Sequence, residues 1–205
     1  MPGPLSHAGA YSLLQRLLGA RAAQREVVDR HARVRAGERV LDLGCGPADV
    51  LALLPEVDYL GVDSDPRYLT AARRRWPGRG RFLAADVTDG DALPGGPFDV
   101  VLALSLLHHL DDDRAENMLA AAAGALEGGG RLVTLDPAAP GSQPRLAGWL
   151  LARDRGAHLR APEEYRRLAE GRFGAVEATV RRDLARLPIA HVILECQSPR
   201  AGSAP

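Results

Sequence analysis

VLDLGCG, residues 40–46, is the stretch of this 205-residue sequence that decides the fold. Its mostly apolar beginning is typical of a buried strand, and its two glycines turn the chain where that strand ends. Pro47 stands where a helix can begin, and we expect this helix to run through Leu54. The stretch therefore predicts a strand, a tight turn and a helix. The glycines let the backbone of the turn approach a ligand without a Cβ atom in the way.

Strands and helices continue to alternate on the carboxyl side of this unit. Such alternation is typical of parallel β-α-β units, whose sheet is covered by helices on both faces. Only residues 184–190 separate the last two strands, which can therefore pair antiparallel as a hairpin. We predict an α/β fold with a doubly wound sheet. The further expected strands are 59–62, 82–85, 99–104, 131–135, 176–183 and 191–196, and the further helices are 66–75, 114–126 and 162–170.

The length fits a single domain over residues 1–205, because chains divide into separate cores only above roughly 250 residues. Apolar residues three and four apart predict an N-terminal amphipathic helix or helix pair, which we interpret as a helical lid. Prolines and a charged group interrupt the pattern after the fifth strand, and we interpret this part as a second, inserted lid. The resulting parts are the helical lid 11–34, the core 38–136, the inserted lid 137–161 and the C-terminal helix and hairpin 162–197.

The composition excludes several classes of protein. Two cysteines, Cys45 and Cys196, are too few for a disulfide framework and lack the spacing of a zinc site, so we expect no metal. The longest apolar run, 100–107, is far shorter than the roughly 20 residues of a membrane span. Residues 1–10 lack the pattern of a secretory signal, so we expect a cytoplasmic protein. All 26 basic residues are arginines, which excludes lysine chemistry.

Charge is unevenly distributed along the chain, although the formal net charge is zero. Residues 40–113 contain thirteen acidic residues and six arginines. This excess of negative charge favours a cationic ligand in the first half of the chain. It also argues against a broad nucleic-acid-binding face there.

Acidic side chains end the second and third expected strands. Asp63 lies 19 residues after Gly44, where a carboxylate can accept both hydroxyls of a ribose. Asp86 can accept a hydrogen bond from the exocyclic amine of adenine. A dinucleotide site is the competing interpretation, but Asp49 replaces the third glycine that such a site uses next to its pyrophosphate. An acidic pocket instead suits a ligand that carries a sulfonium and an ammonium group.

These residues together resemble the class I S-adenosylmethionine-dependent methyltransferases. The resemblance implies a Rossmann-like sheet of seven strands in the order 3-2-1-4-5-7-6, with the last strand antiparallel. The LHHL stretch is most similar to the branch that contains quinone-biosynthesis and natural-product methyltransferases. One departure is Ala48, which stands where the family has the last glycine of its Gly-x-Gly-x-Gly pattern. The motifs cover about residues 38–137 and are VLDLGCG (40–46), GVDSDP (61–66), AADV (84–87), FDVVLALSLLHHL (98–110) and LEGGGRLVTLDP (126–137).

The resemblance also implies a role for particular residues toward S-adenosylmethionine and its product S-adenosylhomocysteine. The glycines of the first motif would approach the methionine part, and the two acidic strand ends would bind ribose and adenine. The backbone of Val87 would contribute to the adenine site, and the end of the fourth strand would line the wall next to the methyl group. The expected cofactor-binding residues are Asp42, Gly44, Gly46, Asp63, Ser64, Asp86, Val87, Leu104 and Ser105.

Three residues are candidates for catalysis. His108 and His109 follow the fourth strand, where an imidazole can deprotonate or polarise an acceptor hydroxyl. The alternative is that they cap the next helix or pack beneath it. Asp136 ends the fifth strand, where such folds often place ligand groups, but it can equally cap the turn before Pro137.

A charged group in the inserted segment can be interpreted in two ways. Asp154, Arg155, His158 and Arg160 could hold an anionic substrate, although a solvated charged loop is the favoured interpretation.

The sequence thus predicts a methyltransferase acting on an oxygen, nitrogen or carbon atom of a small molecule. The alternative is a protein that binds the cofactor without transferring its methyl group, as a regulatory subunit or in a non-methylating reaction. We expect no nucleic-acid partner and no membrane span. The sequence leaves the oligomeric state open, with a homodimer as one option.

Overall fold

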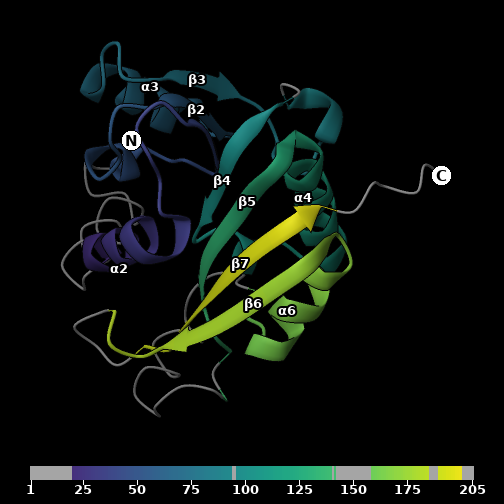
Figure 1. The fold of residues 1–205 in the computed structure, drawn as a ribbon. Coiled ribbons are helices and arrows are strands. Elements are labelled where there is room, and N and C mark those ends of the chain that lie inside the picture. Colours follow the sequence, from purple (N-terminus) through teal and green to yellow (C-terminus); the bar gives the residue numbers. More distant parts are fainter. Residues whose placement is uncertain (1–19, 94–95, 140, 142–157, 185–188, 200–205) are drawn as a thin grey trace, which may run out of the picture.

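A computed structural model describes residues 20–93, 96–139, 141, 158–184 and 189–199. Its centre is a seven-stranded sheet with the order β3-β2-β1-β4-β5-β7-β6 (Figure 1). Neighbouring strands from β3 to β5 run parallel, and β7 runs antiparallel to both β5 and β6. The predicted α/β, Rossmann-like sheet is therefore confirmed. The strands are β1 (Arg39–Leu43), β2 (Asp58–Asp63), β3 (Arg81–Ala84), β4 (Phe98–Leu104), β5 (Leu126–Pro137), β6 (Phe173–Arg181) and β7 (His191–Pro199).

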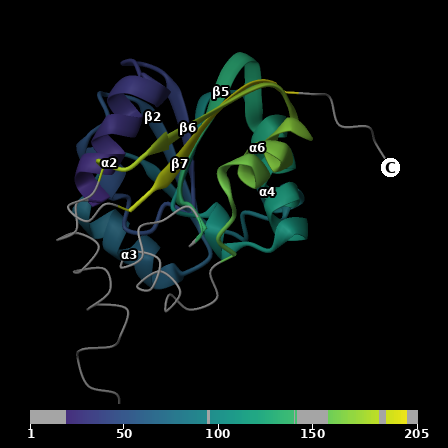
Figure 2. The same ribbon diagram turned by 90° about the horizontal axis from the view of Figure 1, so that it is seen from below.

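Helices cover both faces of the sheet (Figure 2). α4 (Asp112–Ala125) and α6 (Pro162–Glu170) pack on one face, where their apolar side chains form a cluster with alternate strand residues. α2 (Ala20–Glu26) and α3 (Pro66–Arg75) pack on the opposite face in a second cluster. Because successive strand side chains point to opposite faces, each buried strand contributes to both clusters.

The expected helix after β1 is wrong. Residues 47–54 form only one 3₁₀ turn, η2 (Asp49–Ala52). Ala48 precedes this turn in the left-handed conformation, which cannot belong to a right-handed helix. Pro55 follows it, and a proline disfavours helical geometry at the residue before it. The two boundaries leave too few residues for an α-helix.

The N-terminal helical segment forms part of the core in its described portion. α2 continues into a π-helical turn, η1 (Val27–Ala32), in which Val27, Val28 and Ala32 are buried. The expected helical lid 11–34 thus packs against the sheet through these residues, and its role as a lid stays a prediction. Its first part, 11–19, lies outside the described residues.

The carboxyl ends of the parallel strands lie together at one edge of the sheet, which is where ligands bind in open α/β folds. A short 3₁₀ turn, η4 (Leu107–His109), follows β4 at this edge, whereas η3 (Gly90–Ala92) packs against α4 between β3 and β4. In the part of the chain that the structure describes, no helix is both long and apolar enough to cross a membrane.

Candidate active site

The glycine loop (residues 44–48) follows β1 and leaves space beside its backbone. Gly44 and Gly46 have φ angles of 68° and 52°, which favour glycine. A Cβ atom at Gly44 would come within 2.9 Å of Leu106 Cδ1, whereas one at Gly46 would meet no atom of the described residues within 4 Å. Gly44 therefore allows close packing against the loop after β4, and Gly46 borders open space that a ligand can occupy.

Asp63 at the end of β2 is hydrogen-bonded to the glycine loop. The Gly46 N–H donates to Asp63 Oδ2 at 2.9 Å, and the Asp65 N–H donates to Oδ1 at 2.8 Å. Each carboxylate oxygen keeps a further lone pair, so the half-buried group can still accept ligand hydroxyls. The exposed Ser64 lies next to it in the chain.

Ala48 takes the conformation for which the family pattern supplies a glycine. Its φ angle is 55°, and its side chain is buried. The loop therefore keeps its left-handed turn, at a cost of about 1–2 kcal/mol for a residue with a Cβ atom. The next residue, Asp49, forms an ion pair with Arg75 of α3. Its charge is thus balanced within the protein, and the case against a pyrophosphate site now rests on the missing glycine.

Asp42 lies beneath the glycine loop and is only 3% exposed. The Tyr59 hydroxyl donates a hydrogen bond to its Oδ2 atom at 2.5 Å. Burial, with the nearby charge of Asp63, raises the pKa of Asp42 to about 7, although the hydrogen bond from Tyr59 opposes the shift. Asp42 thus links β1 to Tyr59 of β2, and its predicted contact with the cofactor stays a prediction.

The predicted adenine site lies after β3. Asp86 is exposed, and its Oδ1 atom accepts hydrogen bonds from the Thr88 N–H and Oγ1 at 2.9 and 2.8 Å. Arg114 of α4 is 3.1 Å from Oδ2. These hydrogen bonds, first that of the Thr88 N–H, hold the pKa of Asp86 below its usual value. Val87 is buried, so the chain turns back into the core at this point.

The loop after β4 leads into the histidine turn (residues 107–110). Leu104 is half-buried, and Ser105 is exposed with a φ angle of 63°. The Ser105 N–H donates to the Leu135 carbonyl at 2.7 Å, which ties the loop to β5. An exposed residue other than glycine in this conformation is typical of functional sites.

The structure brings the three catalytic candidates together. His108 is 2% exposed, and its Nδ1 atom lies 2.8 Å from Asp136 Oδ1. The same oxygen accepts the His108 backbone N–H at 3.1 Å. Because a carboxylate partner at Nδ1 favours the tautomer protonated there, the neutral ring keeps Nε2 as its proton acceptor. His109 is exposed and stacks on His108 with 3.9 Å between ring centroids.

Asp136 is itself 1% exposed, and its Oδ2 atom makes no hydrogen bond to the described residues. The pKa of the Tyr165 hydroxyl is raised. Burial is the largest cause, and the negative charge of nearby Asp136 is the next. The packing interpretation thus holds for His108, whereas His109 is exposed and its catalytic role stays a prediction.

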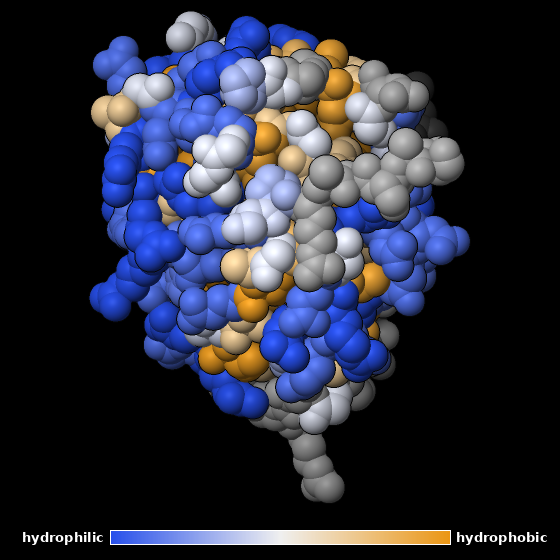
Figure 3. All heavy atoms as spheres, turned by 45° about the vertical axis from the view of Figure 1, so that its right-hand side comes forward, coloured by the Kyte–Doolittle hydropathy of each residue, from blue (hydrophilic) through white to orange (hydrophobic). Residues whose placement is uncertain are grey.

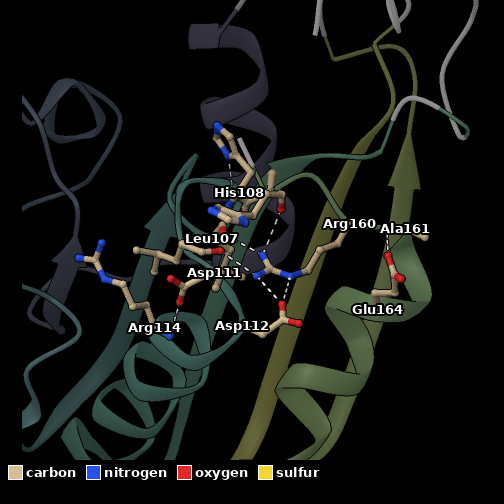
Figure 4. Close-up of polar contacts among 11 residues, drawn as sticks. Leu107, His108, Asp111, Asp112, Arg114, Arg160, Ala161 and Glu164 are labelled. Atoms are coloured by element: carbon tan, nitrogen blue, oxygen red, sulfur yellow. Dashed lines mark hydrogen bonds and ion pairs between the residues drawn. The ribbon is translucent and has the colours of Figure 1, made fainter. Parts of the chain in front are cut away.

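Arg160 is a residue whose place the sequence did not reveal. A solvated charged loop was the favoured interpretation of its segment, but the side chain is buried and points between the histidine turn and α4 (Figure 4). Its partners lie about fifty positions earlier in the chain, so no local pattern could have identified them. His158 is exposed, and Asp154 and Arg155 lie outside the described residues.

A groove of about 630 Å³ lies between α4 and α6. Charged side chains of both signs line it, including Glu116, Glu164, Arg167 and Arg172. On the face drawn in Figure 3, hydrophilic residues surround several separate hydrophobic patches. The groove is lined by charged side chains, whereas the free space at Gly46 of the glycine loop is bordered by backbone.

Comparison with known proteins shows what the cofactor-binding core is similar to. A family model described as a methyltransferase domain matches residues 40–130. Residues 40–130, less than half of the chain, are thus similar to the methyltransferase domain of S-adenosylmethionine-dependent enzymes. S-adenosylmethionine is the cofactor of such domains, and the match does not specify the branch that the LHHL stretch suggested.

Curated methyltransferases match parts of the chain. A trans-aconitate 2-methyltransferase from Methylobacterium nodulans is 42% identical over 92 residues, which are 42% of this chain and 34% of that protein. The 27-O-demethylrifamycin SV methyltransferase from Amycolatopsis mediterranei is 35% identical over 116 residues, 50% of this chain and 40% of that protein. Ribosomal RNA large subunit methyltransferase G from Streptomyces avermitilis is 34% identical over 147 residues, 63% of this chain and 37% of that protein. The matched part of the chain thus spans less than half the length of each of these relatives.

A solved structure shows the same fold over nearly the whole chain. The TehB-like methyltransferase from Corynebacterium glutamicum has a TM-score of 0.66 at 20% identity, covering 94% of this chain and 98% of that one.

Proposed function

We propose that the protein transfers the methyl group of S-adenosylmethionine to an oxygen, nitrogen or carbon atom of a small molecule. The observation that carries this proposal is the contact between the two halves of the site. Leu106, which precedes the histidine turn, packs against Gly44 of the glycine loop. A ligand held by the glycine loop and Asp63 would thus lie beside a turn that presents a histidine.

The residues at the sheet edge fit the cofactor. Gly46 borders space that a Cβ atom would fill, and the Asp63 carboxylate next to it has lone pairs for the two ribose hydroxyls. We propose Gly44 and Gly46 for the methionine part, and Asp86 with the Val87 backbone for adenine. Leu104 and Ser105 would line the wall beside the methyl group. The complete proposed set adds Asp42 and Ser64, the first beneath the loop and the second next to Asp63.

Methyl transfer requires alignment of the reacting atoms more than it requires catalytic side chains. S-adenosylmethionine supplies a methyl group on a positively charged sulfur, which leaves as a neutral thioether. The protein therefore has to hold the acceptor atom in line with that bond and exclude water. A protonated acceptor also has to lose its proton. His109 is exposed and can accept this proton, while Asp136 fixes the tautomer of His108 beneath it.

One of the three curated relatives is named for ribosomal RNA, and the other two support a small molecule as the acceptor. Their names give a tricarboxylic acid and a rifamycin as substrates of those proteins. The excess of acidic residues in the first half of this chain disfavours RNA, whose many phosphates would have to contact a broad face of the protein.

Mass spectrometry after incubation with methyl-labelled S-adenosylmethionine tests the proposal. Trans-aconitate, 27-O-demethylrifamycin SV and ribosomal RNA serve as separate acceptors. We expect label in a small molecule, and its loss in His109→Ala with cofactor binding retained. Label in RNA alone would contradict the proposal. Cofactor binding with no transfer to any of them would favour the alternative of a cofactor-binding protein that does not methylate.

A further inference from the structure

Arg160 is a buried cation that the proposed reaction does not use directly. It precedes α6 and is 6% exposed. A buried guanidinium is costly unless its donors are all engaged, so its partners indicate what it stabilises.

The guanidinium donates to both ends of the histidine turn. Nη1 donates to the Leu107 carbonyl at 3.0 Å, and Nη2 donates to the Leu110 carbonyl at 2.7 Å. Nε and Nη2 also donate to Asp112 Oδ1, at the start of α4, at 2.9 and 2.7 Å (Figure 4). One side chain therefore fixes the two carbonyls that flank the histidines.

The backbone around Arg160 reinforces this attachment. The His158 N–H donates to the His108 carbonyl at 2.5 Å, and Arg160 Nη1 donates to the His158 carbonyl at 3.2 Å. The Arg160 carbonyl accepts the Ala139 N–H at 2.9 Å, just beyond β5. The histidine turn is thus held from the Asp136 side by β5 and from the opposite side by Arg160.

We propose that Arg160 is a positioning residue, which fixes the height of the histidine turn above the sheet edge and so aims His109 at the cofactor site. This inference rests on the proposed function. Leu106, which leads into the turn, touches the glycine loop at Gly44. A shift of the turn would therefore move His109 relative to a bound cofactor. A displacement of about 1 Å at such a site can reduce the rate of transfer by about 10²-fold.

Arginine is required at this position because of its shape. Its planar group presents donors in several fixed directions at once, whereas a lysine ammonium is a compact donor on a flexible stem. Lysine can keep the charge and pair with Asp112, but it cannot reach both carbonyls of the turn in the same geometry. Arg160→Lys therefore separates the positioning role from the charge.

Hydrogen exchange and histidine NMR test the proposal in the full-length protein. The variants are Arg160→Lys and, as a matched control, Arg167→Lys, which makes the same change at an exposed arginine of α6. The His109 and Leu110 amides donate to the Leu106 and Leu107 carbonyls. We expect these two amides to exchange about tenfold faster in Arg160→Lys, because two hydrogen bonds that hold the turn are lost. The β1 amides of Arg160→Lys should exchange at the wild-type rate. In the control variant the His109 and Leu110 amides should also exchange at the wild-type rate.

S-adenosylhomocysteine is the probe for the second readout. In the wild type we expect its addition to shift the ring resonances of His109. In Arg160→Lys it should bind within about threefold of the wild-type affinity while the shift falls by at least half. Wild-type exchange and wild-type ring shifts in Arg160→Lys would overturn the positioning role. A wild-type protein that does not bind S-adenosylhomocysteine would instead contradict the proposed function, while the exchange comparison would still decide whether Arg160 holds the turn.

Discussion

The glycine loop and the histidine turn lie at the same sheet edge but are built in different ways. The glycine loop is formed by backbone, with two positive-φ glycines and a half-buried carboxylate that accepts backbone N–H groups. The histidine turn is held by buried side chains, namely His108, Asp136 and Arg160. The proposed cofactor side therefore depends on a local sequence pattern, whereas the proposed acceptor side depends on contacts between distant parts of the chain.

The two regions differ in how easily substitutions can change them. A backbone loop can bind the same cofactor in many relatives, because its geometry is set by a few glycines. A turn supported by side chains can change with each of those side chains, and it is the part nearest the proposed acceptor. We therefore expect substitutions in the two regions to affect stability and binding in different proportions.

Removal of the buried histidine should have the largest effect. His108→Ala leaves the Asp136 carboxylate buried without its imidazole partner, so we expect it to lower the free energy of unfolding by about 3–5 kcal/mol. His109→Ala, at the exposed neighbouring position, should lower it by less than about 1 kcal/mol. Urea denaturation of both variants measures the difference. Equal losses would mean that the buried pair does not support the turn.

The pH dependence of stability sharpens the comparison on the glycine-loop side. The folded-state pKa of Asp42 is raised to about 7, so between pH 4 and 7 the folded protein binds more protons at this group than the unfolded chain does. Stability should therefore fall as the pH rises through this window. Asp42→Asn should be more stable than the wild type at pH 8, by roughly 4 kcal/mol, because it removes a buried charge.

Thermal denaturation from pH 4 to 8 measures this effect. Asp58→Asn is the control, since Asp58 lies at the exposed start of the same strand pair. A variant at Asp42 with the wild-type pH profile would show that the buried carboxyl does not titrate in this range.

The two glycines of the loop should respond differently to the same change. Gly44→Ala places a methyl group against Leu106 in a left-handed conformation, so we expect a loss of about 2–3 kcal/mol in stability. Gly46→Ala meets only the conformational cost, about 1 kcal/mol, but its methyl group enters the space proposed for the cofactor. Calorimetry and denaturation together should show the larger stability loss at Gly44. At Gly46, the loss of affinity should exceed the loss of stability.

The smallest effect is expected at Ala48. Ala48→Gly relieves about 1–2 kcal/mol of left-handed strain but removes a buried methyl group worth about 0.8 kcal/mol. The net change should be a gain of no more than about 1 kcal/mol, with cofactor affinity unchanged. A clear loss of stability would mean that the methyl group matters more than the strain.

The sequence predicted the elements that local signals define. The helices Pro66–Arg75 and Pro162–Glu170 were predicted with the observed bounds, because a proline marks each start and charged residues follow. The strand order was implied by the family resemblance and is confirmed. The helix expected through Leu54 was wrong because the left-handed Ala48 was not foreseen.

The histidine turn was only partly predictable. Its residues were chosen as candidates because they follow a strand, and the structure brings His108 and Asp136 into contact across 28 positions. Nothing local to Arg160 distinguishes it from the other arginines in its part of the chain, since its role depends on carbonyls that only the folded sheet brings near. Side-chain networks of this kind have no short sequence pattern.

The central claim is that the glycine loop and Asp63 bind S-adenosylmethionine. Calorimetric titration of the wild type, Asp63→Ala and the control Asp58→Ala tests it most directly, since both variants lose one carboxylate from the same strand, β2. We expect binding to the wild type and to Asp58→Ala with similar affinity, and binding to Asp63→Ala weakened by about 10²-fold because two charge-assisted hydrogen bonds are lost. Equal affinity in Asp63→Ala and the wild type, or no binding to the wild type, would contradict the claim.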